Sequence, residues 1–143
     1  MKLHIVTIGK PKLSYAIEGW NEYYTRLSRF HEVRTTQLSD KYADDAAKIM
    51  SASEGSYRVI LEIEGKLYSS QDLATFLEKR ELESREVSFI IGGPNGLPQE
   101  IRQAADTQLS LGGLTLPHDL AMVVTLEALY RASTINAHIP YHR

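Results

Sequence analysis

The chain has 143 residues, a formal net charge of −2 and no cysteine. This length favours a single domain over residues 1–143, with a core large enough to fold without a disulfide or metal. The absence of cysteine excludes disulfides, thiolate zinc sites, iron–sulfur clusters and cysteine nucleophiles. No stretch approaches the about 20 apolar residues of a membrane span, and no signal peptide is recognisable. We therefore expect a cytoplasmic protein that binds neither membrane nor metal.

Charge is distributed unevenly along the chain. Residues 1–34 hold six cations and three acids, whereas the remaining 109 residues hold ten cations and fifteen acids. A basic end on an acidic body permits local contact with phosphate, although an ordinary solvated surface explains the same counts.

Strand patterns alternate with helix patterns along the chain. Apolar and β-branched residues predict strands at 2–8, 32–38, 57–63, 86–91 and 109–111. Helices are predicted over 14–27, within 39–55, from 70 to about 82, over 98–105 and over 117–136. This alternation is typical of one compact α/β domain with a parallel sheet covered by helices on both faces.

Three of these helices have recognisable starts. Ser14 is the expected hydroxyl cap of the first helix, and Ser69 with Asp72 has the spacing of a capping box. Pro98 is expected at the first position of its helix, where a missing N–H does no harm.

The last predicted helix is apolar nearly all round. Between Leu120 and Tyr130, only Thr125 and Glu127 are polar. A peripheral helix is covered on one face only, so we expect the other face to form a homodimer interface. The alternative is a central helix wrapped by its own chain. Glu127 and Arg131 have the spacing of an ion pair on this helix.

Two glycine-bearing loops are candidate binding segments. Residues 91–96 (IGGPNG) lie between a strand and a helix, but they match neither a dinucleotide fingerprint nor a phosphate loop. Taken alone, this loop is equally compatible with a simple turn. Residues 109–118 form an apolar loop without acids, which suits an uncharged aromatic ring or a sulfonium. His118 ends this loop and is either a functional residue or a helix-start histidine.

The chain ends with three residues that could act on a nucleic acid. Tyr141 can stack on a base, His142 is a base of near-neutral pKa, and Arg143 can bind phosphate. Chain ends usually fray, so a disordered tail is the alternative.

Together, these segments resemble the ribosomal RNA large subunit methyltransferase H family of the SPOUT superfamily. The similarity extends over the whole chain. The segments that carry it are LEIEGK at 61–66, IGGPNG at 91–96, LTLPH at 114–118, LYRA at 129–132 and PYHR at 140–143.

The resemblance implies a trefoil-knotted SPOUT fold and an obligate homodimer. It also implies methyl transfer from S-adenosylmethionine to N3 of pseudouridine 1915 of 23S rRNA, in the assembled ribosome. The family's cofactor-binding positions fall on Leu61, Gly92, Leu111, Gly112, Gly113, Leu114, Thr115 and Leu116.

The candidate catalytic residues are His118, Glu127, Arg131, Tyr141, His142 and Arg143. His142 is the first candidate for the base that takes the N3 proton, and His118 is the second. Arg131 and Arg143 could hold phosphate or balance charge on the imide, and Tyr141 could stack on the target base. Because we expect the tail to reach the partner's pocket, we predict a composite site.

Two departures from the family and two rival functions accompany this interpretation. Met122 stands where the family usually has arginine, and Ala128 where it often has glutamine. A nucleotide-binding oxidoreductase would need a dinucleotide fingerprint after the first strand, and residues 9–12 do not provide one. A non-catalytic ribosome-binding dimer would keep the fold but bind no cofactor.

Overall fold

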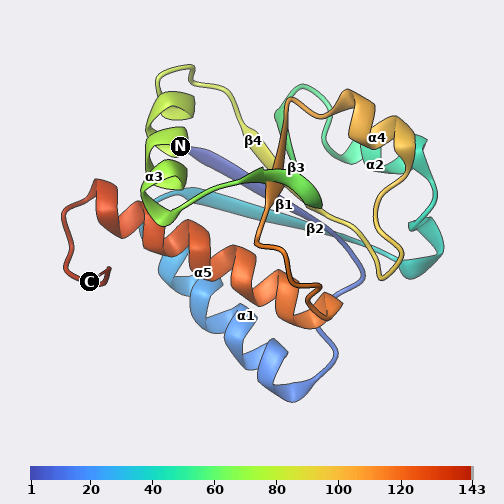
Figure 1. The fold of residues 1–143 in the computed structure, drawn as a ribbon, viewed down its shortest axis with the longest axis horizontal. Coiled ribbons are helices and arrows are strands. Elements are labelled where there is room, and N and C mark those ends of the chain that lie inside the picture. Colours follow the sequence, from blue (N-terminus) through green and yellow to red (C-terminus); the bar gives the residue numbers. More distant parts are fainter. Residues whose placement is uncertain (143) are drawn as a thin grey trace.

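The computed structural model describes residues 1–142, and within that range it contains five strands, five α-helices and one short 3-10 helix (Figure 1). The strands are β1 (Lys2–Ile8), β2 (Glu32–Leu38), β3 (Tyr57–Leu67), β4 (Val87–Ile91) and β5 (Thr107–Ser110). The helices are α1 (Ser14–Leu27), η1 (Asp40–Tyr42), α2 (Ala46–Ala52), α3 (Ser70–Glu81), α4 (Gln99–Ala104) and α5 (His118–Asn136). The predicted alternation of strands and helices is confirmed.

The five strands form one sheet in the order β2-β1-β4-β3-β5, and every pair that the register defines is parallel. β1 and β4 are buried almost throughout, and β4 is apolar except at Ser88, whereas β1 also buries His4 and Thr7. Since all strands point the same way, the loops that follow β3, β4 and β5 leave the sheet at one edge.

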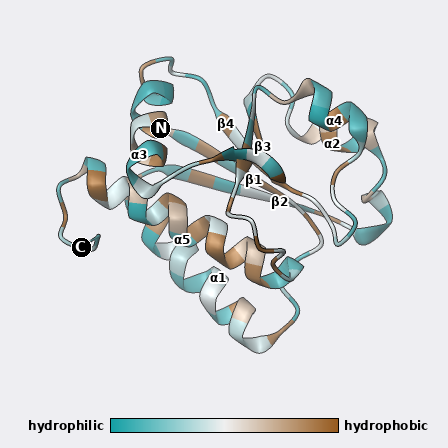
Figure 2. Ribbon diagram, viewed as in Figure 1, coloured by the Kyte–Doolittle hydropathy of each residue, from teal (hydrophilic) through white to brown (hydrophobic). Residues whose placement is uncertain are grey.

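Helices cover both faces of the sheet, as the alternation predicted. Along β1, Leu3 and Ile5 join a core with α1, α3 and α5, whereas Val6 and Ile8 join a core with α2 and α4. The side chains alternate because successive residues of a strand point to opposite faces. Hydrophobic residues recur along the strands and along α5 in Figure 2.

Two of the three predicted helix starts differ in detail. The capping box is confirmed. The Asp72 amide donates to the Ser69 hydroxyl and the Ser69 amide donates to the Asp72 carboxylate, each at a distance of 3.0 Å. Ser14, however, is the first residue of α1, and no side chain caps that helix. Pro98 precedes α4 as its N-cap residue instead of occupying the first position.

α5 packs against α1 and α3 on one face of the sheet. Met122 is fully buried there, so at this departure from the family the side chain contributes to the core. A side chain at Gly19 would approach Val123 to 2.9 Å, so the glycine lets α1 and α5 come close. Leu13, just before α1, and Ile17 within it stay 56% and 44% exposed, and Val123 is only partly buried. The homodimer and the knot remain predictions.

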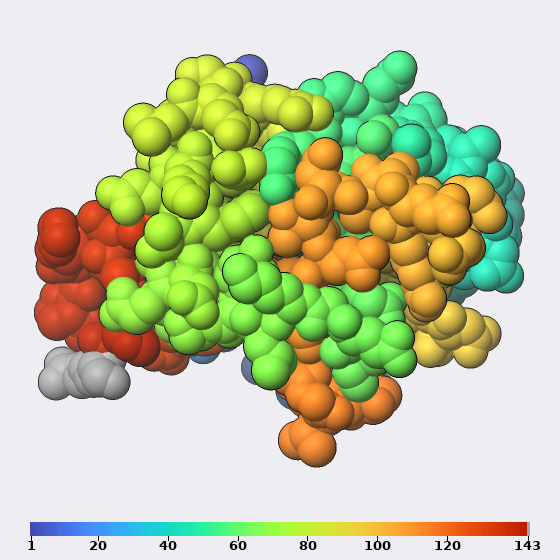
Figure 3. All heavy atoms as spheres, turned by 45° about the horizontal axis from the view of Figure 1, so that its top comes forward, coloured from blue at the N-terminus to red at the C-terminus, as the bar shows by residue number. Residues whose placement is uncertain are grey.

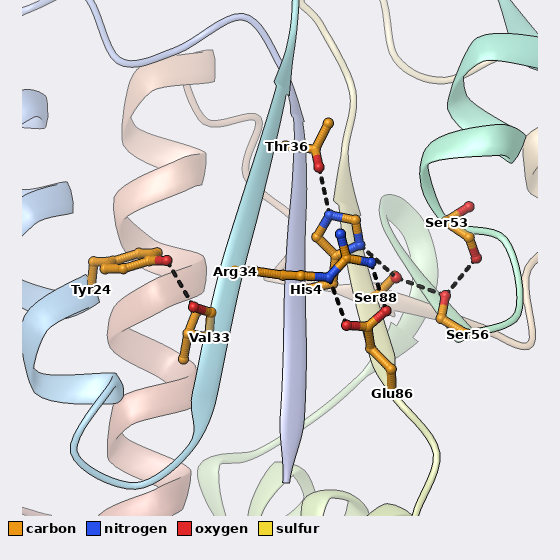
Figure 4. A network of polar contacts seen from close by, with 9 residues as sticks. All are labelled: His4, Tyr24, Val33, Arg34, Thr36, Ser53, Ser56, Glu86 and Ser88. Carbon is orange, nitrogen blue, oxygen red and sulfur yellow. Dashed lines mark hydrogen bonds and ion pairs between the residues drawn. The ribbon is translucent and has the colours of Figure 1, made fainter.

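A buried polar chain crosses the amino end of the sheet (Figure 4). His4 contacts the Thr36 hydroxyl at 2.7 Å and Ser88 at 3.4 Å, and Ser88 contacts Ser56 at 2.7 Å. Burial, with the nearby charge of Arg34, lowers the pKa of His4, so the ring is neutral at pH 7. The contacts satisfy polar groups that would otherwise be costly to bury.

Candidate functional site

A cleft of about 330 Å³ opens at the carboxyl edge of the sheet. Its walls come from the end of β3, the loop after β4, the loop after β5 and the first turn of α5. Figure 3 shows the loop after β5 (orange) beside the end of β3 (green) on this side of the molecule. Ligands of open parallel sheets commonly bind at this edge.

Seven of the eight positions predicted to bind cofactor line the cleft: Leu61, Gly92, Leu111, Gly112, Leu114, Thr115 and Leu116. Gly113 is not among the lining residues. The structure therefore brings together residues that are up to 55 positions apart in the sequence. The two loops meet because β4 and β5 both pair with β3.

Glycine is required at two points of the wall. A side chain at Gly92 would lie 2.9 Å from the carbonyl carbon of Gly96 and from Leu97, so it would force the loop after β4 apart. Gly112 has a φ of +136°, a conformation that residues with a side chain rarely adopt. Both glycines keep backbone close to the cleft.

β3 is irregular where it reaches the cleft. Leu61 pairs with Leu109, and after an excursion of four residues Lys66 pairs with the same residue. The strand therefore continues to Leu67, beyond the predicted end at residue 63. Ser110 connects this excursion of β3 to the loop after β5. Its hydroxyl donates to the Ile63 carbonyl at 3.0 Å and accepts the Gly112 amide at 3.1 Å.

Of the lining residues, all of which belong to the described range, three carry titratable side chains: Glu62, Arg102 and His118. Glu62 and Arg102 form an ion pair of 3.3 Å. Sequence reasoning missed this pair, because only the position of Glu62 beside Leu61 pointed to it and nothing pointed to Arg102.

His118 lies at the α5 side of the cleft with a fixed tautomer. Its Nε2 donates to the Ile8 carbonyl at 2.7 Å, and since a carbonyl only accepts, Nε2 carries the proton. In the neutral ring, Nδ1 therefore carries the lone pair.

The neighbouring Asp119 anchors the start of α5. Its carboxylate accepts the backbone amides of Lys12 at 2.9 Å and Leu13 at 2.7 Å. Burial opposes ionisation here, but the two amide hydrogen bonds outweigh it and lower the pKa of Asp119. These contacts fix the segment just before α1 against the start of α5.

The other candidate catalytic residues form a second group at the far end of α5, which we call the tail cluster: Glu127, Arg131, Tyr141 and His142. Arg131 pairs with Glu127 at 2.7 Å, which confirms the predicted ion pair. The Tyr141 hydroxyl donates to the Glu127 carboxylate at 3.1 Å, and Arg131 lies 3.4 Å from Nδ1 of His142. Arg143 lies outside the described residues.

Tyr141 is held from several sides. Its ring packs edge-on against Tyr130, with 4.6 Å between the ring centroids, and the Arg131 guanidinium lies 4.7 Å from its centroid. Burial, a hydrogen bond with Tyr23 and the negative charge of Glu127 together raise the pKa of Tyr141. The phenol is therefore protonated at neutral pH, and the tail is ordered through His142 against its own helix.

Within one chain the cleft and the tail cluster are separate. Arg131 follows His118 by thirteen positions, which corresponds to about 20 Å along the axis of α5. In Figure 1 the chain end lies beyond the end of α5 that is opposite its start. One chain therefore does not bring His142 to the cleft.

No group of three or more His, Asp or Glu side chains within residues 1–142 is placed to hold a metal ion. None of the helices in that range has both the length and the apolar character to cross a membrane.

Comparison with known proteins agrees with this geometry. A family model described as predicted SPOUT methyltransferase matches residues 1–142. A relative from Deinococcus deserti named "Ribosomal RNA large subunit methyltransferase H" is 46% identical over 100% of both chains.

Solved structures share the fold at low sequence identity. A methylase family protein from Haemophilus influenzae has a TM-score of 0.61 at 15% identity, covering 99% of this chain and 70% of the other. A protein from Legionella pneumophila, described as a methyltransferase and solved with the cofactor SAM bound, has a TM-score of 0.50 at 16% identity. The match covers 92% of this chain and 66% of that chain.

Proposed function

Since the chain belongs to the SPOUT methyltransferase family, we propose that it transfers a methyl group from S-adenosylmethionine to N3 of a pseudouridine in large-subunit ribosomal RNA. The name of the Deinococcus relative supports ribosomal RNA as the substrate. We place the target in 23S rRNA of the assembled ribosome and propose that the enzyme acts as a homodimer.

The observation that carries this proposal is the convergence of seven family cofactor positions on one cleft. Leucines and glycine backbone make up most of the wall, which suits the adenosine part of the cofactor. A side chain at Gly92 would press on Gly96 and Leu97 and so displace the loop after β4, which forms one wall of the cleft.

For methyl transfer, the protein has to position the two reactants and remove the proton from N3. When bound, S-adenosylmethionine supplies an electrophilic methyl group in line with the attacking nitrogen. The target N3 must lose its proton to expose a lone pair, and a histidine placed beside it can take that proton. His142 is the first candidate, and Nδ1 of His118 is the second, since its Nε2 is already committed to Ile8.

The tail cluster is suited to hold the RNA. Arg131 presents a guanidinium to phosphate or to the negative charge that develops on the imide, while Glu127 fixes its orientation. Tyr141 offers a rigid ring for stacking on a base. Arg143 is proposed to add a second cation to this group.

A second copy of the chain would unite the two groups. The cleft and the tail cluster are about 20 Å apart along α5, which is too far for one substrate atom to reach both. The exposed apolar residues Leu13 and Ile17, with the half-buried Val123, provide a surface for a second copy. We therefore propose a composite site, with the cleft of one protomer and the tail of its partner.

The proposal is tested on ribosomes from a strain that lacks this gene. Incubation with the purified protein and S-adenosylmethionine is expected to add one methyl group to one pseudouridine of 23S rRNA, located at N3 by mass spectrometry of nuclease fragments. Calorimetric titration with S-adenosylmethionine is the companion measurement. Ribosome binding without methylation and without heat would instead identify a non-catalytic ribosome-binding dimer.

A further inference from the structure

The ion pair of Glu62 and Arg102 differs from the other charged contacts of the molecule, because it lines the cleft. Glu62 follows Leu61 on β3, and Arg102 comes from α4, on the face of the sheet opposite α5. The Glu62 side chain is 13% exposed and that of Arg102 is 37% exposed. Both therefore present charge to the cleft while remaining partly screened from water.

Within the described part of the chain, the contact between Glu62 and Arg102 leaves a hydrogen-bond donor of the guanidinium without a partner. Nε of Arg102 is buried and has no aligned hydrogen-bond partner among residues 1–142, although Glu62 is 3.3 Å away. The pair of Arg34 and Glu86, by contrast, makes two parallel hydrogen bonds of 2.8 Å each. The guanidinium also carries Nη donors, and because the side chain is 37% exposed these donors can meet a ligand in the cleft.

The backbone around Arg102 makes room for its guanidinium. A side chain at Gly96 would come within 3.3 Å of Nη2 of Arg102, and Gly96 has a φ of +81°. The loop after β4 therefore depends on glycine at this point and leaves the guanidinium beside the cleft wall.

We propose that Glu62 and Arg102 bind the amino-acid end of the cofactor, with Glu62 accepting its α-ammonium and Arg102 donating to its α-carboxylate. This inference rests on the proposed function. The ammonium and carboxylate of an α-amino acid are attached to one carbon, so they match a carboxylate and a guanidinium that lie side by side. The apolar remainder of the cleft then receives the nucleoside, and the pair sets both the orientation of the cofactor and its selection over free nucleosides.

The test compares two ligands that share a thioether nucleoside. S-adenosylhomocysteine carries the amino-acid end, and methylthioadenosine lacks it. Calorimetry on the full-length protein is expected to show that S-adenosylhomocysteine binds at least about tenfold more tightly. Glu62→Gln and Arg102→Gln each lower that affinity about tenfold, whereas methylthioadenosine affinity stays within about twofold. Arg102→Lys restores part of the loss, because it keeps the positive charge.

Glu83→Gln is the matched control, because Glu83 forms an ion pair with Arg80 at 3.2 Å and does not line the cleft. It is expected to leave both affinities unchanged. Equal weakening of both ligands in the Glu62 and Arg102 variants would overturn the inference, since the pair would then hold the nucleoside. Unchanged affinities would overturn it as well. If the unaltered protein binds neither ligand, the proposed cofactor is wrong and the inference falls with it.

Discussion

The two ends of α5 serve different chemistry. At its start, the cleft is built from backbone, leucines and glycines that come from three strands of the sheet. At its far end, the tail cluster consists of charged and aromatic side chains from the helix and the last residues of the chain. The first group is suited to hold a small molecule and the second to hold a polyanion. Because one helix separates them, each group is complete as a binding surface and incomplete as a catalytic site.

Removal of Tyr141–Arg143 is the change with the largest expected effect. Loss of the base candidate, the stacking ring and one cation is expected to reduce methylation by about 100-fold or more. Affinity for S-adenosylmethionine should stay within about twofold, because neither Tyr141 nor His142 lines the cleft. Methyl incorporation into ribosomes and calorimetry measure the two effects separately. Equal activity of the shortened protein would exclude the tail from the reaction.

Mixing two inactive proteins tests whether the groups cooperate between protomers. One chain carries Gly92→Val, which displaces the loop at the cleft wall, and the other lacks Tyr141–Arg143. If the tail acts on the partner's cleft, refolding them together yields mixed dimers with one working site. Activity is then expected to recover to about a quarter of the original. If no activity returns although mixed dimers form, the tail acts within its own chain.

Gly92→Ala is expected to impair the cleft alone. The added carbon would lie 2.9 Å from backbone of Gly96, and relief of such a contact typically costs about 1–3 kcal/mol. Cofactor affinity should fall about tenfold to 100-fold, as measured by calorimetry. Gly113→Ala is the matched control, because an added carbon there meets nothing within 4 Å and the residue does not line the cleft. A similar loss in both variants would show that space at Gly92 is not the cause.

Acidification is expected to loosen the tail end of α5 before the cleft end. His31 contacts Ser133 at 2.9 Å, and burial with the nearby amino terminus lowers its pKa to about 4. As pH drops, His31 is therefore protonated in the unfolded chain before it is protonated in the folded one. The free energy of unfolding falls by about 1–3 kcal/mol as pH drops from about 6.5 to 4. Asp119 has a lowered pKa instead, so its contribution is lost only below about pH 4.

Hydrogen exchange at pH 7 and pH 5 measures this difference. Protection factors, which correct for the slower intrinsic exchange at pH 5, should fall in the last turns of α5 and change less in its first turns. His31→Gln, which removes the titrating group, should flatten the pH dependence of urea unfolding. A uniform loss of protection along the helix would show that the two ends do not respond separately.

Much of the fold could be predicted because its signals are local. Strand patterns, the capping box at Ser69 and the spacing of Glu127 and Arg131 depend on residues close together in the sequence, and the structure confirms them. The predictions for Ser14 and Pro98 were less exact. Ser14 lies inside the helix, and Asp119, from a distant helix, instead accepts the amides of the two residues before it, while Pro98 lies one residue outside its helix.

The composition of the candidate site follows from the sequence, since two glycine loops and a tail of specific side chains are visible as motifs. Their placement depends on crossovers between strands. The pair of Glu62 and Arg102 joins β3 to α4, which are far apart in the sequence, and no local pattern records that contact. Likewise, the straight run of α5 keeps Tyr141 and His142 away from the cleft of their own chain. Local sequence specifies which groups are available, whereas the long-range packing of helices and strands specifies which of them meet.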